Sequence, residues 1–335
     1  MAFLSANSYM GLVVETTRGT LPTGGTPVYI PVTSPQVTPN QTFLRDEALR
    51  GSPVMTYDQI QGVRNDEYEG KFYLFADTFG NLVKSIMGGA DSVSDNAGSY
   101  THDLLLLNDS SIGSQPDSYS ILDFDGANYF TITGAQGDSI NLTYGAEAAA
   151  DATVKFFGNP YTSYTTAPAP FTSLSLSTEH MIPAWDTTIT VGMSTLNYIQ
   201  TGELKLERKT APIFTMGNQA PYQNFAGPIE VTGKFTAVVD SNADMWSTGS
   251  GAEALTYSPQ TVSITLTDPN DTHNSINDSI TFIMDNVQFH TVKRVRGKEY
   301  TEVEVEFTAN ANVSDAITGY SPIVVQIING ISTPY

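Results

Sequence analysis

The sequence predicts a mainly β protein. Thr, Ser, Val, Tyr and Gly are abundant and long helical periodicity is nearly absent, which is typical of β-rich chains. Extended runs are separated by clusters of Gly, Pro, Asn and Asp that favour turns. The tripeptide Gly-Lys-Phe opens two of these runs, at residues 70 and 233, which is an offset of 163 residues. The chain therefore contains a candidate internal repeat.

Further pairs of similar residues follow the same order in both halves, at offsets that drift from 163 to 160 residues. They are Arg45 and Arg208, Asn108-Asp109-Ser110 and Asn270-Asp271-Thr272, Asp117-Ser118 and Asp278-Ser279, and Gly137 and Gly297. A large repeat indicates one fold that was duplicated, and duplicated folds are common in symmetric assemblies. We expect a first domain at residues 1–158, a linker at 159–175 and a second domain at 176–335.

The first half begins with predicted strands and one helix. The strands cover residues 11–15, 28–32, 41–44, 69–75 and 102–107, with turn chemistry at 35–40. The helix covers residues 77–87, because Asp77 is a candidate N-cap and Gly88-Gly89 ends the pattern. Its apolar residues share one stripe, with the spacing i, i+3, i+4, i+7 and i+8: Phe79, Leu82, Val83, Ile86 and Met87. This stripe predicts a helix that covers one face of a sheet.

A β-hairpin is expected near the end of the first half. Residues 129–133 and 139–143 are its strands, and residues 134–138, which hold two glycines, are its turn. Residues 159–172 contain Pro160, Pro168 and Pro170, which are disfavoured in central strands and suit an extended connection.

The second half repeats this layout. Strands are predicted at residues 187–191, 203–207, 229–239 and 261–266, and a short helical turn at 240–246. A long hairpin follows, with strands at 285–296 and 299–308 and a two-residue turn at Gly297-Lys298. This turn would place Arg296 opposite Glu299, Lys293 opposite Glu302 and Val292 opposite Val303.

The long hairpin should have one packed face and one wet face. Val303, Val305 and Phe307 alternate with Glu302, Glu304 and Glu306, so the glutamates share the wet face. A row of this kind is either a solvated strand face or the negatively charged wall of a channel.

Composition excludes several classes of protein. The net charge is −20, which argues against a protein that grips nucleic-acid phosphates but suits one that lets DNA pass without adhering. Cysteine is absent, which excludes disulfides and thiolate metal sites. We find neither a signal peptide at the first residues nor a run of roughly 20 apolar residues that could cross a bilayer.

No catalytic, cofactor or metal site is predicted. The four histidines have no ligand spacing, and nucleophile-elbow, P-loop and dinucleotide motifs are absent. The loop at residues 268–272 could bind calcium, but it lacks the EF-hand pattern and Asn and Asp also make turns. The cluster of Lys293, Arg294 and Arg296 could bind phosphate, although nearby glutamates favour internal pairing.

Two sets of motifs occur in a fixed order along the chain. In the second half they are Trp185 to Ile189, Leu206-Glu207-Arg208, Gly217 to Pro221 and Gly227 to Phe235. In the first half they are residues 45–51, the strand at Gly70 with its helix, Tyr100-Thr101-His102 and Pro116 to Tyr119. Together these motifs resemble the tail tube proteins of bacteriophages with long, flexible tails, and the resemblance covers roughly residues 8–310.

The resemblance implies two tandem β-sandwich or half-barrel domains, each with a flanking short helix and a long β-hairpin. Hairpins of neighbouring subunits would close an inner barrel, and the rings would stack into a tube that carries the viral genome into the host. If a single-copy protein forms six-fold rings, a duplicated chain needs three subunits. The alternative is a six-subunit ring with the second half outside.

The same resemblance suggests roles for particular residues and partners. Glu302, Glu304, Glu306 and Asp138 would line the channel, and residues 16–26 and 330–335 would contact the next ring. The tape-measure, tail terminator and distal tail proteins would be partners in a tail assembled in the host cytoplasm. Competing hypotheses are a capsid-decorating or receptor-binding virion protein, a β-sandwich adhesin, and a carbohydrate-binding module or carbohydrate-active enzyme.

Overall fold

The computed structural model describes residues 5–108, 115–192, 194–196, 198–238, 259–296, 299–316 and 319–335. This part of the chain is mainly β, with strands β1 to β20, one α-helix and short 3-10 turns at Ser5–Asn7 and Ala184–Asp186. The named strand pairs are all antiparallel. The predicted mainly β fold is therefore confirmed.

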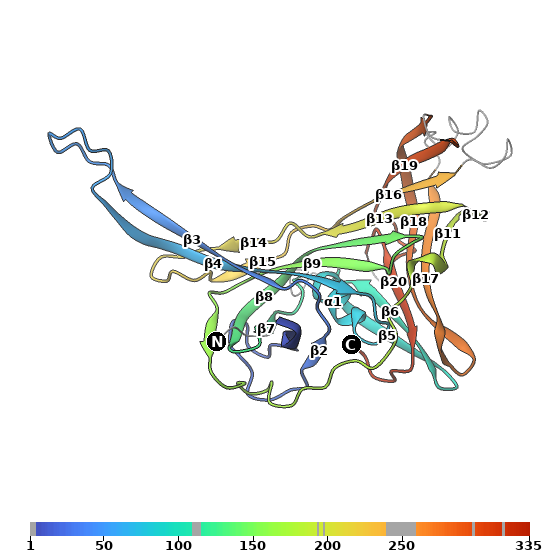
Figure 1. Ribbon diagram of the computed structural model, residues 1–335, viewed down its shortest axis with the longest axis horizontal. Helices are drawn as coiled ribbons and strands as arrows, with labels where there is room; N and C mark the ends of the chain where they lie inside the picture. The colour runs from blue at the N-terminus through green and yellow to red at the C-terminus, as the bar shows by residue number, and fades with distance from the viewer. Residues whose placement is uncertain are drawn as a thin grey trace.

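Eight strands follow one another through consecutive ladders, and we call them the eight-stranded sheet (labelled in Figure 1). Their order is β3 (Gln36–Asp46), β4 (Asp58–Tyr73), β9 (Asp151–Gly158), β8 (Tyr129–Gly145), β13 (Ile199–Glu207), β16 (Glu230–Val238), β19 (Glu302–Ala309) and β18 (Ile276–Val295). The ladder between β8 and β13 joins the N-terminal half of the sheet to the C-terminal half.

The two longest strands, β8 and β18, each continue from the eight-stranded sheet into a second sheet. The first part of β8 pairs with β7 (Tyr119–Phe124) and β10 (Thr162–Tyr164), and β7 leads on to β1 (Tyr9–Val14) and β2 (Val28–Ile30). The first part of β18 pairs with β17 (Gln260–His273) and β20 (Val324–Asn329). Outside these lie β11 (Thr187–Val191), β12 (Ser194–Leu196), β6 (Ser99–Leu106) and β5 (Gly88–Asn96).

The pairing pattern recurs in the two halves. In the first half β8 pairs with β7, β9 and β10, while β7 also pairs with β1. In the second half β18 pairs with β17, β19 and β20, while β17 also pairs with β11. The strands that carry Gly-Lys-Phe, β4 and β16, occupy the same position in each set, next to β9 and β19.

Other echoes in the sequence fall at positions that do not correspond. Arg45 lies on β3 opposite Gln59, which is eleven residues before Gly70 on β4. Arg208 follows the end of β13 and lies four residues after Leu204, the ladder partner of Gly233. Asp117-Ser118 precedes β7, but Asp278-Ser279 lies within β18. Among the predicted echoes in the described residues, the Gly-Lys-Phe pair is the one that matches the strand pattern.

The packed face of the eight-stranded sheet contributes to one large apolar cluster. Its buried side chains come from both halves and include Leu142, Val154, Leu204, Phe235 and Val305. Burial of each such side chain stabilises the fold by roughly 1.5–3 kcal/mol relative to an exposed one. The core therefore runs across the β8–β13 ladder.

Helix α1 (Phe79–Met87) packs on this face, as its apolar stripe predicts. It lies against β8 at Gly137, where an added Cβ would be 2.7 Å from Cγ1 of Ile86 and 3.0 Å from the carbonyl oxygen of Ser85. A side chain at this position would push the helix away. Gly137 is therefore required for close helix–sheet packing, and it lies in the middle of a strand.

The predicted hairpin at residues 129–143 is wrong, because Gly137 serves helix packing rather than a turn. Residues 129–145 form the single strand β8, and the glycines that suggested a turn produce irregular register instead. The predicted turn at residues 35–40 is also wrong, because residues 36–40 belong to β3. The expected linker contains strand β10, and the helical turn predicted at 240–246 lies outside the described residues.

The outer parts of β3 and β4 extend far beyond the rest of the protein (Figure 1, upper left). We call residues 40–65 the arm, because β4 gains its second partner, β9, only at Asp66. The loop of the small hairpin β14 (Ala211–Ile213) and β15 (Gln223–Phe225) supports the arm, since the Arg64 amide donates to the Gln219 carbonyl at 2.9 Å. Six large apolar side chains of the arm are exposed: Phe43, Leu44, Leu49, Val54, Met55 and Ile60.

Candidate functional site

The second face of the eight-stranded sheet is wet and charged, and we call it the wet face. Strand β13 illustrates the alternation: Leu204 and Leu206 are fully buried, whereas Glu203, Lys205 and Glu207 on the other side are half-buried. Neighbouring strands alternate in the same way because residues opposite one another in a ladder point to the same side. A continuous polar surface results.

Acids outnumber lysines on the wet face. The acids are Glu67, Glu69, Asp151, Glu203, Glu207, Glu230, Glu304 and Glu306, and the lysines are Lys71, Lys155, Lys205, Lys234 and Lys293. Lysine is thus spread over both halves, and the surface has a modest negative charge rather than an unbroken acidic one.

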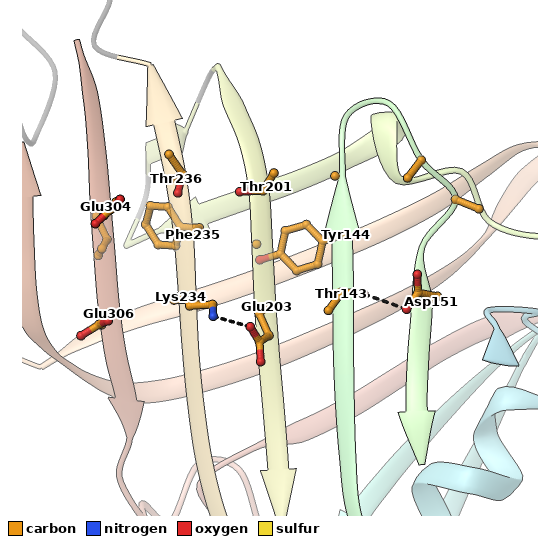
Figure 2. Close-up of a pocket in the computed structure, with 15 residues that line it drawn as sticks. Thr143, Tyr144, Asp151, Thr201, Glu203, Lys234, Phe235, Thr236, Glu304 and Glu306 are labelled. Atoms are coloured by element: carbon orange, nitrogen blue, oxygen red, sulfur yellow. Dashed lines mark hydrogen bonds and ion pairs between the residues drawn. The ribbon is translucent and has the colours of Figure 1, made fainter. Parts of the chain in front are cut away.

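Ion pairs partly neutralise this charge. Lys234 Nζ lies 2.5 Å from Glu203 Oε2 (Figure 2), and similar pairs join Lys205 to Glu207 at 2.6 Å and Lys155 to Glu67 at 2.8 Å. Exposed pairs of this kind are worth about 0–1 kcal/mol each. Their main effect is therefore to lower the field of the wet face rather than to hold the sheet together.

The structure separates the four predicted channel-lining residues into three environments. Glu304 and Glu306 lie on the wet face (Figure 2): Glu304 pairs with Lys293 at 3.3 Å, and Glu306 is exposed. Glu302 shares this side of β19 by alternation, but it is buried rather than wet, since it is only 3% exposed. Asp138 is half-buried at the irregularity in β8, where its Oδ1 accepts a hydrogen bond from the Thr210 amide at 2.7 Å.

Burial raises the pKa of Asp138 above its ordinary value, although the Thr210 hydrogen bond and Lys155 oppose this shift. The Asp138 carbonyl also accepts a hydrogen bond from the Arg208 amide at 2.7 Å. Asp138 therefore connects β8 to the segment that follows β13. Its position is not that of a hairpin tip matching β18–β19.

The predicted register of the β18–β19 hairpin is wrong by two residues. Lys293 lies opposite Glu304 instead of Glu302, and Val292 lies opposite Val305 instead of Val303. The ladder closes at Val295 and Glu302, so the connection is longer than a two-residue turn. An even shift keeps each side chain on its predicted face, which is why the alternation of Val303, Val305 and Phe307 was still correct.

A depression of about 600 Å³ lies where β8, β13, β16 and β19 run side by side (Figure 2). Its lining contains carboxylates, one lysine, threonine hydroxyls and aromatic rings, and histidine is absent from it. The Thr143 hydroxyl is bonded to Asp151 Oδ1 at 2.8 Å, and Glu203 is paired with Lys234. These groups already satisfy one another, so the depression resembles a strand surface more than a catalytic centre.

Two acidic clusters with a histidine lie away from the wet face. Glu179, His273 and Asp278 form one, and their ligand atoms lie within 4.8 Å of one another; His180, Asp268 and Asp271 form the other. Both could hold a cation. Burial and then the charges of Asp77, Asp278 and Asp271 raise the pKa of Glu179 to about 7.

The loop considered above for calcium has a simpler structural role. The Asn270 amide donates to Asp268 Oδ1 at 2.8 Å, which is an Asx turn. His273 Nδ1 lies 2.7 Å from Asp278 Oδ1, so the histidine and the buried acid are partners. We assign no metal to either cluster.

Sequence reasoning missed the contact that organises the wet face, which is the β8–β13 ladder. It runs from Ser139 opposite Glu207 to Gly145 opposite Thr201. One local signal for close approach exists: an added Cβ on Gly202 would be 2.2 Å from the ring of Tyr144, its partner in the ladder. A glycine in a strand indicates such an approach but does not name the partner.

No helix among the described residues is long and apolar enough to span a membrane. A comparison with curated proteins gives no match. The model of the phage tail tube protein family matches residues 5–309, which is most of the chain. The mainly β fold is consistent with this match. The chain therefore belongs to the phage tail tube protein family, as a structural component of the virion tail.

Proposed function

We propose that this protein polymerises as stacked rings into the tail tube and that the wet face lines the channel through which the genome is ejected. The observation that carries the proposal is the eight-stranded sheet, which is packed on one face, polar on the other and ends in edge strand β3. A sheet of this kind closes into a barrel when its ends pair with neighbouring subunits.

The recurring strand pattern supports a duplicated subunit with domains at residues 1–158 and 176–335. Each half supplies four strands to the sheet, β3, β4, β9 and β8 from the first and β13, β16, β19 and β18 from the second. One chain then provides two equivalent sectors of the ring. Three chains make a pseudo-six-fold ring.

The role of the lining is electrostatic. Glu304 and Glu306 are its best-placed acids, while Glu302 and Asp138 contribute negative charge close to the same surface. Because DNA carries one phosphate charge per about 1.7 Å, a lining with excess acids repels it and keeps it from adhering. The proposed activity needs no catalysis and no cofactor.

Stacking of rings requires contacts along the tube axis. The arm is well suited to this, because it projects from the body (Figure 1) and its large apolar side chains are exposed in the described part of the chain. Residues 16–26 remain candidates for such contacts. Residues 330–335 are weaker candidates, since the Tyr335 hydroxyl bonds to the Ala76 carbonyl at 2.7 Å within the same subunit.

In this proposal the partners are other copies of the chain, the tape-measure, tail terminator and distal tail proteins, and DNA in transit. Assembly takes place in the host cytoplasm. Negative-stain electron microscopy of the purified, concentrated protein tests the proposal. Hollow tubes or rings are expected; compact particles that never assemble, even when seeded with tail tips, would favour a capsid-decorating, receptor-binding or adhesin role instead.

A further inference from the structure

The ladder between β8 and β13 joins the two halves of the sheet, and the equivalent ladder between β18 and β3 cannot form within one chain. Each half of the eight-stranded sheet has the same order of strand types, β3-β4-β9-β8 followed by β13-β16-β19-β18. Within the chain, the last strand of the first set pairs with the first strand of the second set. The last strand of the second set, β18, and the first strand of the first set, β3, stand at opposite ends of the sheet.

We propose that β18 of one subunit pairs with β3 of the next subunit in the register that β8 and β13 use inside the chain. This inference rests on the proposed function and adds the strands and the residues that meet. The internal ladder is the template, because it joins two sectors of the same kind. The occupant of each edge is a second copy of this chain.

The edge strands have room for this contact. Among the described residues, β3 pairs with β4 alone, and Gln36, Pro39 and Asn40 are exposed. Residues 291–293 of β18 pair with β19 on one side, whereas the β17 ladder stops at Val287 and the β20 ladder at Ile283. In the part of the chain that the structure describes, no strand runs along the other side of residues 291–293.

The register follows from the two strands that carry Gly-Lys-Phe. Taking Gly70 as equivalent to Gly233 makes Glu69 equivalent to Thr232; their partners are Gln36 on β3 and Lys205 on β13. Gln36 therefore corresponds to Lys205.

The other edge is aligned in the same way. Lys71 lies opposite Thr153, which lies opposite Asn141. Lys234 lies opposite Glu306, which lies opposite Thr291. Thr291 therefore corresponds to Asn141.

Inside the chain Asn141 lies directly opposite Lys205. The transferred register places Thr291 of one subunit opposite Gln36 of the next. Both positions of the internal pair are half-buried on the wet face, so the corresponding contact between subunits would border the channel.

The hydrogen-bond pattern identifies this as a close pair. The Ala146 amide donates to the Gln200 carbonyl at 2.9 Å, and the Arg208 amide donates to the Asp138 carbonyl at 2.7 Å. Hydrogen-bonded pairs alternate along an antiparallel ladder, so Asn141 and Lys205 form a non-hydrogen-bonded pair. Cα atoms in such pairs are about 4.5 Å apart, within the range that a disulfide can bridge.

Two prolines lie along the same edge. The Leu74 amide donates to the Ala150 carbonyl at 3.3 Å, so the even-numbered residues of β4 are hydrogen-bonded to β9. Pro39 lies opposite Asp66 of β4, so its nitrogen, which carries no hydrogen, faces away from β4. Pro35 precedes Pro39 by four residues, so in an extended chain its nitrogen faces the same side. The outer edge of β3 thus keeps the donor of Val37 and the carbonyl acceptors, and it pairs less readily with unrelated strands before assembly.

The chain contains no cysteine, so introduced pairs report without background. The test variant is Thr291→Cys with Gln36→Cys, and the matched control is Asn141→Cys with Lys205→Cys. A third variant, Thr291→Cys with Ser34→Cys, probes a register displaced by two residues. Each is assembled, oxidised and analysed by denaturing electrophoresis and electron microscopy.

The control should form a disulfide within one chain. The test variant should form covalent oligomers that end at the ring size, which is three, while Thr291→Cys/Ser34→Cys stays largely monomeric. If the double variant fails to assemble, the single variants Thr291→Cys and Gln36→Cys are mixed, and covalent dimers are expected.

Different failures have different meanings. Rings or tubes without a Thr291–Gln36 link, in a sample where the Asn141–Lys205 control is oxidised, would overturn the edge pairing and leave the proposed function intact. Preferential linking of the Thr291→Cys/Ser34→Cys variant would overturn the register. Failure of the cysteine-free protein to form rings or tubes would instead count against the proposed function.

Discussion

The ring of Phe307 on β19 lies across the backbone of Gly233, its partner on β16: a Cβ added to Gly233 would be 2.2 Å from Cζ of that ring. Both residues belong to the packed face, and Phe307 is 1% exposed. The glycine of the second Gly-Lys-Phe segment is therefore a packing requirement of the eight-stranded sheet.

Gly233→Ala should lower the free energy of unfolding by about 1–3 kcal/mol, because the ring must move within a packed core. The measurement is chemical denaturation followed by circular dichroism. Gly145→Ala on β8 is the matched control, since its added Cβ would meet the nearest atom at 3.7 Å. Equal effects of the two substitutions would contradict the assigned role of Phe307.

Thermal stability should fall as the pH rises from 5 to 8. Burial raises the pKa of Asp123 to about 6 and, together with Asp77, that of Glu179 to about 7. Burial alone would lower the pKa of His102, but the hydrogen bond and charge of Asp91 outweigh it and raise that pKa above 6.5. Each raised pKa means that the folded state binds its proton more tightly than the unfolded state does.

The stabilisation that each group contributes is therefore complete below the pKa that the group has in the unfolded state. It is lost as the pH rises through the pKa of the same group in the folded state. The windows are about pH 4–6 for Asp123, about 4.5–7 for Glu179 and above 6.5 for His102. Differential scanning calorimetry across this range measures the effect, and Glu179→Gln should flatten the curve. A melting temperature that rises steadily from pH 5 to 8 would contradict this assignment.

Charge reversal on the wet face should make tubes retain DNA. Glu304→Lys with Glu306→Lys replaces two negative charges with two positive ones, which raises the net charge by four units per chain. We expect salt-sensitive binding of short duplex DNA to assembled tubes, which the unaltered tubes lack. Asp95→Lys, at an exposed position on the β5–β6 hairpin, raises the net charge by two units and is the matched control for Glu306→Lys alone. Identical DNA retention by the wet-face and Asp95 variants would exclude the channel assignment of these glutamates.

Polar substitution of the arm should shorten tubes without preventing rings. Leu49 is fully exposed and Met55 is 76% exposed, so Leu49→Ser with Met55→Ser removes apolar contacts that the isolated subunit does not use. Tube length in electron micrographs is the readout. Val313→Ser, at a residue that is 64% exposed outside the arm, should leave length unchanged.

Local patterns predicted much of the secondary structure. Residues 187–191 coincide with β11, the predicted strand that begins at residue 229 starts one residue before β16, and the apolar stripe located α1. Alternation and helical spacing are properties of adjacent residues, so they can be recognised without knowledge of the fold.

Contacts between distant segments could not be predicted in this way. The sequence around Gly137 predicts a turn, because a turn and a close helix contact both favour glycine. The helix that explains this glycine lies about fifty residues earlier. The β8–β13 ladder pairs segments more than fifty residues apart, and its alternation would fit several partners. The burial of Glu302 likewise depends on neighbours beyond its own strand.

The most direct measurement of the central claim is rotational averaging of end-on views of assembled rings. The account predicts three subunits per ring and a pseudo-six-fold lumen, with each chain supplying two similar sectors. Rings with six complete subunits would contradict it, because the second half of the sheet would then have no place in the wall of the channel.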